Sequence, residues 1–183
     1  MPKNIDNNRS GLAGEFAVLS RLAQKGFDAS LTFGNTKSVD ILAVNNKTGE
    51  QFQIEVKTAS YMKSLYGGKW GKHCFWNVGE KIFDQERKYN KKIFAFVWFP
   101  NEEEVAGIVA KQPEDRKPDY AYIFIVPGRE VLSYIRDART KSPGKGVKKN
   151  FALRIGFGKD VLDWNHYLNN FSLLTHKGHK KGE

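Results

Sequence analysis

The sequence has a single cysteine, Cys74, and no long apolar run. One thiol cannot form an intramolecular disulfide or build a multi-thiolate metal site, which fits a reducing compartment. No stretch approaches the ~18 apolar residues of a membrane span, and the polar residues 1–10 lack the apolar core of a signal peptide. We therefore expect a cytoplasmic protein with no membrane association, in which Cys74 is structural rather than nucleophilic.

Negative charge is also scarce: 30 Lys and Arg face 20 Asp and Glu, for a formal net charge of +10. A field of this sign attracts polyanions, which favours nucleic acid or an anionic membrane surface as partner. Hydrophobic residues make up 40% of the 183 residues, enough for a packed core of one domain. We assign residues 1–175 to a single domain and residues 176–183 to a disordered basic tail.

The periodicity of apolar residues predicts an α/β protein. Residues 10–25 have helical spacing, with Ser10 as N-cap and Gly26 as the stop. Strands are predicted at 30–33, 39–44, 51–58, 93–99, 120–126 and 151–155, further helices at 80–90, 130–138 and 160–168, and irregular segments at 66–72, 101–117 and 141–150. The turn-rich residues 45–50 make a hairpin of the second and third strands. This order predicts helices around a mixed sheet.

Polar side chains line one face of the predicted strand 51–58, where Gln53, Glu55 and Lys57 alternate with apolar residues. If residues 45–50 form the turn, Asp40 falls opposite Glu55, with Cβ atoms ~5 Å apart. Two carboxylates at that distance repel each other unless a cation neutralises them.

A divalent cation is the expected partner of this pair, because oxygen-only ligands suit Mg²⁺, with Mn²⁺ as a substitute. Lys57 can then stabilise developing negative charge or assist an attacking water. The alternative is a solvated ribbon face that carries no chemistry. Against it, Leu42 and Val44 share this face with Asp40, which predicts that the face is partly covered.

Glu15 lies on the first predicted helix, at the edge of its apolar stripe. That position predicts a side chain directed at the sheet or its margin, and the alternative is a boundary glutamate that reaches solvent.

Together, Glu15, Asp40 in the segment SVDIL and the pair Glu55 and Lys57 in IEVKT resemble the PD-(D/E)xK nuclease superfamily. The pattern is most similar to archaeal Holliday-junction resolvases and their small phage and bacterial relatives. The resemblance covers residues 12–60, and Val39 stands where the family name has proline.

This resemblance implies a restriction-endonuclease-like core in the order αβββαβ, with C-terminal additions. It also implies Mg²⁺-dependent phosphodiester hydrolysis, with Asp40 and Glu55 as metal ligands, Lys57 at the attacking water and Glu15 completing the catalytic set.

Two basic segments are candidates for contact with nucleic acid. Residues 66–76 mix basic and aromatic side chains suited to phosphate contact and stacking, and 141–149 is rich in lysine. The predicted contacts are Lys69, Trp70, Lys72 and His73, with Lys145, Lys148 and Lys149. The alternatives are a turn whose aromatic residues dock on the domain and a solvated charge run.

The sequence therefore favours a metal-dependent endonuclease acting on duplex or branched DNA. RNA is an alternative substrate, and a homodimer is an alternative to a monomer. The main rival is an inactive nucleic-acid-binding protein with the same fold. A structural or membrane-surface protein that uses only its charge is a third reading.

Overall fold

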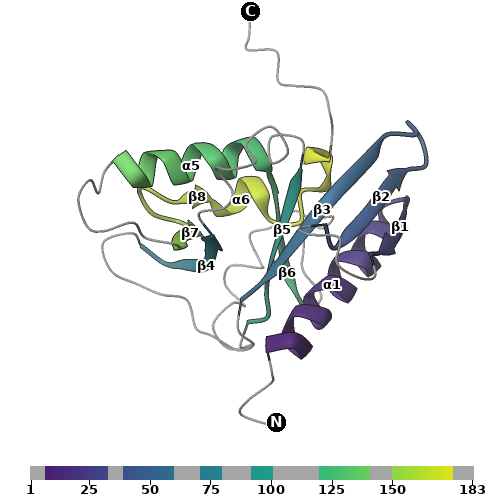
Figure 1. Ribbon diagram of the computed structural model, residues 1–183, viewed down its shortest axis with the longest axis horizontal. Helices are drawn as coiled ribbons and strands as arrows, with labels where there is room; N and C mark the ends of the chain where they lie inside the picture. The colour runs from purple at the N-terminus through teal and green to yellow at the C-terminus, as the bar shows by residue number, and fades with distance from the viewer. Residues whose placement is uncertain are drawn as a thin grey trace, which may run out of the picture.

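The computed structural model describes residues 7–32, 39–59, 71–79, 92–100, 120–140 and 150–174. Their elements, drawn in Figure 1, are α1 (Asn7–Gln24), β1 (Phe27–Leu31), β2 (Ile41–Asn45), β3 (Gln51–Thr58), β4 (His73–Gly79), β5 (Ile93–Trp98), β6 (Tyr122–Pro127), α5 (Gly128–Thr140), β7 (Asn150–Gly156), β8 (Leu162–Asp163), α6 (Trp164–Tyr167) and the 3₁₀ helix η3 (Phe171–Leu173).

The central sheet has five strands in the order β1-β2-β3-β5-β6. Its pairs are antiparallel except for β3 and β5, which run parallel. The predicted α/β class, a mixed sheet flanked by helices, is confirmed. Strands β5 and β6 are buried along their whole length, which explains their continuous apolar sequences.

Helix α1 covers one face of this sheet, and α5 lies on the opposite side (Figure 1). The buried stripe of α1 consists of Ala17, Val18 and Leu22, whereas Leu12 and Phe16 are 47% and 52% exposed. The helix therefore packs on the sheet through Ala17, Val18 and Leu22, and its other large apolar residues, Leu12 and Phe16, face away from the sheet. Ser10, expected as the N-cap, lies inside the helix, which begins at Asn7.

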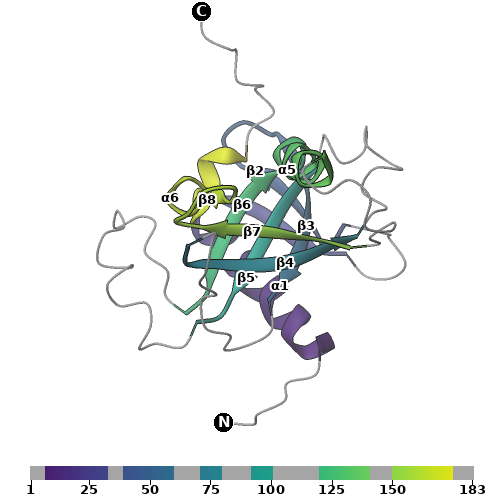
Figure 2. The same cartoon turned by 90° about the vertical axis from the view of Figure 1, so that its left-hand side faces the viewer.

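One face of the central sheet, here called the aromatic face, carries Phe94, Phe96 and Phe124 of β5 and β6. A second sheet, in the order β4-β7-β8, packs on this face. Figure 2 shows β4 and β7 crossing in front of β5 and β6. Strand β4 begins at His73, directly after the irregular segment predicted at 66–72, and buries Cys74, Trp76 and Val78 on one face. No strand was predicted at this position, where alternate apolar residues form one by pairing with β7.

The C-terminal part also differs from the prediction. The closing helix expected at 160–168 is reduced to the four residues of α6, because the Asp163 carboxylate accepts the backbone N–H groups of Asn165 (2.7 Å) and His166 (3.3 Å) and starts the helix at Trp164. The predicted helix 80–90, the segments 101–117 and 141–149 and the tail 176–183 lie outside the described residues. None of the described helices is long and apolar enough to cross a membrane.

Candidate active site

The β2–β3 hairpin has the register expected from the sequence. Its turn closes between Asn45 and Glu50, where the Asn45 N–H donates to the Glu50 carbonyl at 2.9 Å and Gly49 adopts a φ of +71°. Val44 pairs with Gln51, as predicted, and the ladder continues to Ile41 opposite Ile54. Continued by one residue, this register puts Asp40 opposite Glu55.

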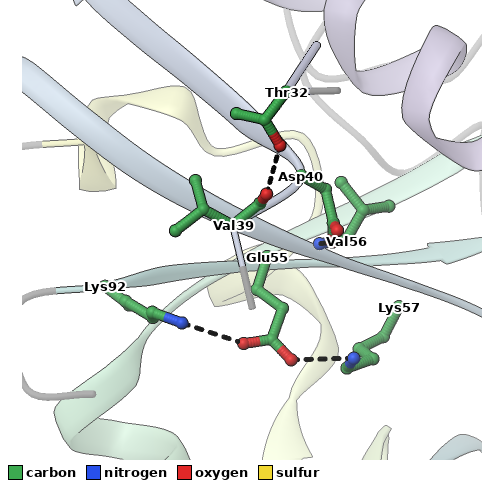
Figure 3. Close-up of polar contacts among 7 residues, drawn as sticks. All are labelled: Thr32, Val39, Asp40, Glu55, Val56, Lys57 and Lys92. Atoms are coloured by element: carbon green, nitrogen blue, oxygen red, sulfur yellow. Dashed lines mark hydrogen bonds and ion pairs between the residues drawn. The ribbon is translucent and has the colours of Figure 1, made fainter. Parts of the chain in front are cut away.

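Asp40 is fixed by its own backbone and side chain (Figure 3). Its N–H donates to the Ile54 carbonyl at 2.9 Å, and its carbonyl accepts the Thr32 N–H at 2.9 Å. The carboxylate Oδ2 accepts the N–H of Val56 at 2.7 Å. The Thr32 hydroxyl also donates to the Val39 carbonyl. Contacts to both neighbouring strands thus orient this carboxylate.

Glu55 is 6% exposed and lies between two ammonium groups (Figure 3). Lys57 Nζ is 2.7 Å from Oε1, and Lys92 Nζ is 3.3 Å from Oε2. The Lys57 side chain is 37% exposed, whereas that of Lys92 is fully buried. The repulsion expected between Asp40 and Glu55 is therefore already opposed by two protein cations.

Lys92 is a site residue that the sequence analysis missed. It precedes β5, whose parallel register sets Ile93 beside Ile54 and so brings Lys92 alongside β3. The available signal was a lysine at the start of a continuous apolar strand, where an ammonium needs a buried partner.

The hairpin face that carries Asp40 and Glu55 is buried at a different place from the one that the sequence predicted. Leu42, which was expected to mark a covered face, is 47% exposed. Glu55 is buried instead where the same sheet face continues across β5, whose Phe94 stands beside it in the register. The face is thus open toward β2 and closed toward β5.

Glu15 reaches the same end of the sheet through a close helix-to-strand contact. A Cβ added to Gly14 would overlap the Thr58 hydroxyl and lie 3.1 Å from the Thr58 Cβ, so only glycine allows α1 this near to the end of β3. Partial burial, and then the negative charge of Asp40, raise the pKa of Glu15. The two carboxylates therefore lie within electrostatic range.

Several charges act on Asp40. Burial raises the pKa of its carboxyl, with a smaller contribution from the Glu55 charge, while the Val56 N–H and the ammonium groups of Lys57 and Lys92 oppose that rise. All four predicted catalytic residues are thus gathered at one end of β3, together with Lys92.

The donor set can be compared with the needs of a divalent cation. Among the residues that the structure describes, no three His, Cys, Asp or Glu side chains form a ready-made metal group. Mg²⁺ is typically bound by one or two carboxylates plus water and substrate phosphate. Asp40 and Glu55 fit that smaller set, since the Val56 hydrogen bond uses one of the two Asp40 oxygens.

Of the predicted nucleic-acid contacts, the structure describes Lys72 and His73. Lys72 is exposed directly before β4. His73 is 3% exposed, with its Nδ1 2.9 Å from the Gly71 carbonyl oxygen, so its prediction as a surface contact was wrong. Alternation along β4 places His73 on the face opposite to Cys74, Trp76 and Val78, yet its side chain is buried there as well. The other predicted contacts, Lys69, Trp70, Lys145, Lys148 and Lys149, lie outside the described residues.

Comparison with known proteins gives a likeness in structure. No family model matches the sequence, and no curated protein matches it. Among solved structures, a bacterial homing endonuclease, I-Ssp6803I, matches with a TM-score of 0.48 and 13% identity, over 92% of this chain and 90% of that one. A likeness this weak carries no argument about activity.

Proposed function

We propose that this protein is a metal-dependent endonuclease of the PD-(D/E)xK type that hydrolyses phosphodiester bonds in DNA. The observation that carries the proposal is the grouping of Asp40, Glu55 and Lys57, in which the Lys57 ammonium lies 2.7 Å from a Glu55 carboxylate that is only 6% exposed. A merely solvated ribbon face would leave such a glutamate in water rather than fix it.

The residues have different tasks in this proposal. Asp40 and Glu55 would hold Mg²⁺, which supplies Lewis-acid activation of water and of the phosphodiester. Lys57 sits at the exposed side of Glu55 and would stabilise negative charge that develops on the phosphate. The raised pKa of Glu15 brings this carboxyl closer to the range in which it exchanges protons at neutral pH.

DNA is the proposed substrate because the chain carries a net charge of +10. The exposed Lys72, together with Lys69, Trp70, Lys145, Lys148 and Lys149, would contribute contacts to the phosphate backbone and bases. Duplex and branched DNA are the proposed forms.

An inactive nucleic-acid-binding protein is the second candidate, and one observation favours it. Lys57 and Lys92 already neutralise Glu55, one at each carboxylate oxygen. In an inert protein these ion pairs would be permanent, and no divalent cation would compete for the carboxylate.

The deciding experiment incubates the protein with supercoiled plasmid, single-stranded DNA, a four-way junction and RNA, with and without Mg²⁺ or Mn²⁺. Wild-type protein should cut DNA only with metal. Lys57→Ala should lower the cleavage rate about 10²-fold or more without weakening DNA binding, because the ammonium acts mainly in the transition state.

Lys47→Ala is the matched control, since Lys47 is an exposed lysine in the turn at the far end of the same hairpin. It should cut at the wild-type rate. Tight binding without any cleavage would leave the inactive binder as the function, and cleavage by Lys57→Ala at the wild-type rate would place the activity elsewhere.

A further inference from the structure

The two lysines that contact Glu55 differ in their access to solvent. Lys57 approaches Oε1 at 2.7 Å with 37% of its side chain exposed, whereas Lys92 approaches Oε2 at 3.3 Å from a side chain that is fully buried. Figure 3 shows them on opposite sides of the carboxylate. The same chemical group is thus held in two different environments.

Lys92 is locked in place by the elements around it. Its carbonyl accepts the N–H of Gly128, the first residue of α5, at 2.8 Å. The next residue, Ile93, pairs with Ile54 in the parallel ladder. A buried ammonium that left its carboxylate would lose its counterion without gaining water, which is strongly unfavourable. The ion pair between Lys92 and Glu55 should therefore stay formed.

The ion pair between Lys57 and Glu55 can break more easily. Lys57 lies near the end of β3 with part of its side chain in solvent. The lysine stem is flexible, and an exposed ammonium exchanges a carboxylate for water at little cost. A cation that arrives at Glu55 can therefore displace Lys57 far more easily than Lys92.

We infer that Lys92 is a positioning residue, a permanent counterion that fixes Glu55 through Oε2, and that Lys57 is an exchangeable counterion that gives up Oε1 to a divalent cation. This inference rests on the proposed function. It explains how Glu55 can be paired with two lysines and still serve as a metal ligand. Displacement would also release the Lys57 ammonium on the side of the carboxylate that is open to solvent.

The test compares the same substitution at both lysines. Mn²⁺ affinity is measured by titration calorimetry on the full chain, at one pH and ionic strength, for Lys57→Met and Lys92→Met. Lys57→Met should bind Mn²⁺ as tightly as wild type or more tightly, because a competitor is gone. Lys92→Met should bind about tenfold more weakly or worse, as when an orienting partner of a metal ligand is lost, because Glu55 then loses the buried ion pair at Oε2.

Lys92→Gln separates orientation from charge, because its amide can still donate to Oε2. It should keep Mn²⁺ affinity within about threefold of wild type, since second-shell hydrogen bonding is retained. If Lys92 acted only by repelling the cation, both Lys92 variants would bind Mn²⁺ more tightly than wild type, and that result would overturn the inference.

A measurement on wild-type protein covers the case in which Lys92→Met does not fold. The side-chain ammonium groups are followed by ¹⁵N nuclear magnetic resonance during titration with Mg²⁺, with Lys57→Met to assign the signals. The Lys92 signal should persist, and the Lys57 signal should move toward that of a solvated lysine. Loss of the Lys92 signal with retention of the Lys57 signal contradicts the inference.

Failure of the inference can be told apart from failure of the proposed function. If wild-type protein binds neither Mn²⁺ nor Mg²⁺, both the inference and the proposed function are wrong. If wild-type protein binds Mn²⁺ and Lys92→Met binds it equally well, only the assignment of Lys92 is wrong.

Discussion

The candidate site and the aromatic core around Trp164 are held together in different ways. At the candidate site, a few directional contacts fix the geometry, among them the Asp40 bond to the Val56 N–H and the two ion pairs of Glu55. On the aromatic face, Trp164 packs against Phe124 at 4.7 Å and Phe157 at 5.0 Å between ring centroids. Aromatic packing depends on buried area and shape. Substitutions on the aromatic face should therefore change the free energy of unfolding most, whereas the contacts at the site mainly fix the orientation of its side chains.

The largest effect is expected on the aromatic face. Trp164 is fully buried and contacts Trp98 and Tyr122 as well. Trp164→Ala should lower the free energy of unfolding by about 3–5 kcal/mol, because it removes a large buried ring and leaves a cavity. Chemical denaturation at equilibrium measures this loss.

A matched pair of phenylalanine variants sharpens the result. Within the described residues, the Trp164 indole N–H has no hydrogen-bond partner, whereas that of Trp76 donates to the Val97 carbonyl at 3.2 Å. Trp76→Phe should therefore cost about 1 kcal/mol more than Trp164→Phe. Equal costs would mean that the indole hydrogen bond adds nothing to this packing.

A smaller effect is expected where α1 meets β3. Gly14→Ala should lower the free energy of unfolding by about 1–2 kcal/mol, because overlap with Thr58 outweighs the better helix propensity of alanine. Gly11→Ala, on the same helix with nothing within 4 Å of an added Cβ, should instead stabilise by about 0.5–1 kcal/mol.

The double variant Gly14→Ala, Thr58→Ala identifies the cause. The Thr58 hydroxyl is buried without a hydrogen-bond partner in the described structure, so its removal sacrifices no bond. The double variant should recover the stability lost in Gly14→Ala. Without recovery, the close approach of α1 to Thr58 would not be the source of the loss.

The smallest effect concerns Glu15. Its pKa lies above the ordinary value of 4.5, so the folded state binds the proton more tightly than the unfolded state. Stability is therefore unaffected by Glu15 below pH 4.5 and falls as pH rises through the folded pKa. Glu15→Gln should raise the melting temperature at pH 7 in metal-free buffer, and the gain should vanish below pH 4.5, where Glu15 is protonated in both states.

Because burial and then the charge of Asp40 raise this pKa, the gain from Glu15→Gln should be smaller in an Asp40→Asn background. An equal gain in both backgrounds would mean that the two carboxylates do not interact.

Local patterns predicted the site end of the sheet better than strand β4 of the second sheet. The bounds of β3 and the hairpin register follow from residues less than twenty positions apart, where alternation and turn composition decide the structure. Strand β4 could not be predicted in this way because its partner, β7, is distant in the sequence. Lys92 was missed for the same reason, since it meets Glu55 only across the parallel pair β3 and β5.

The distance between β4 and β7 also affects how the chain is made. About 70 residues separate Gly79 from Asn150, and at ~5–20 residues per second a ribosome needs roughly 4–14 s to add them. During that interval the nascent β4 has no β7 to pair with, and Cys74 and Trp76 lack the neighbours that later bury them. Only after β7 emerges does burial raise the pKa of the Cys74 thiol and protect it from oxidation.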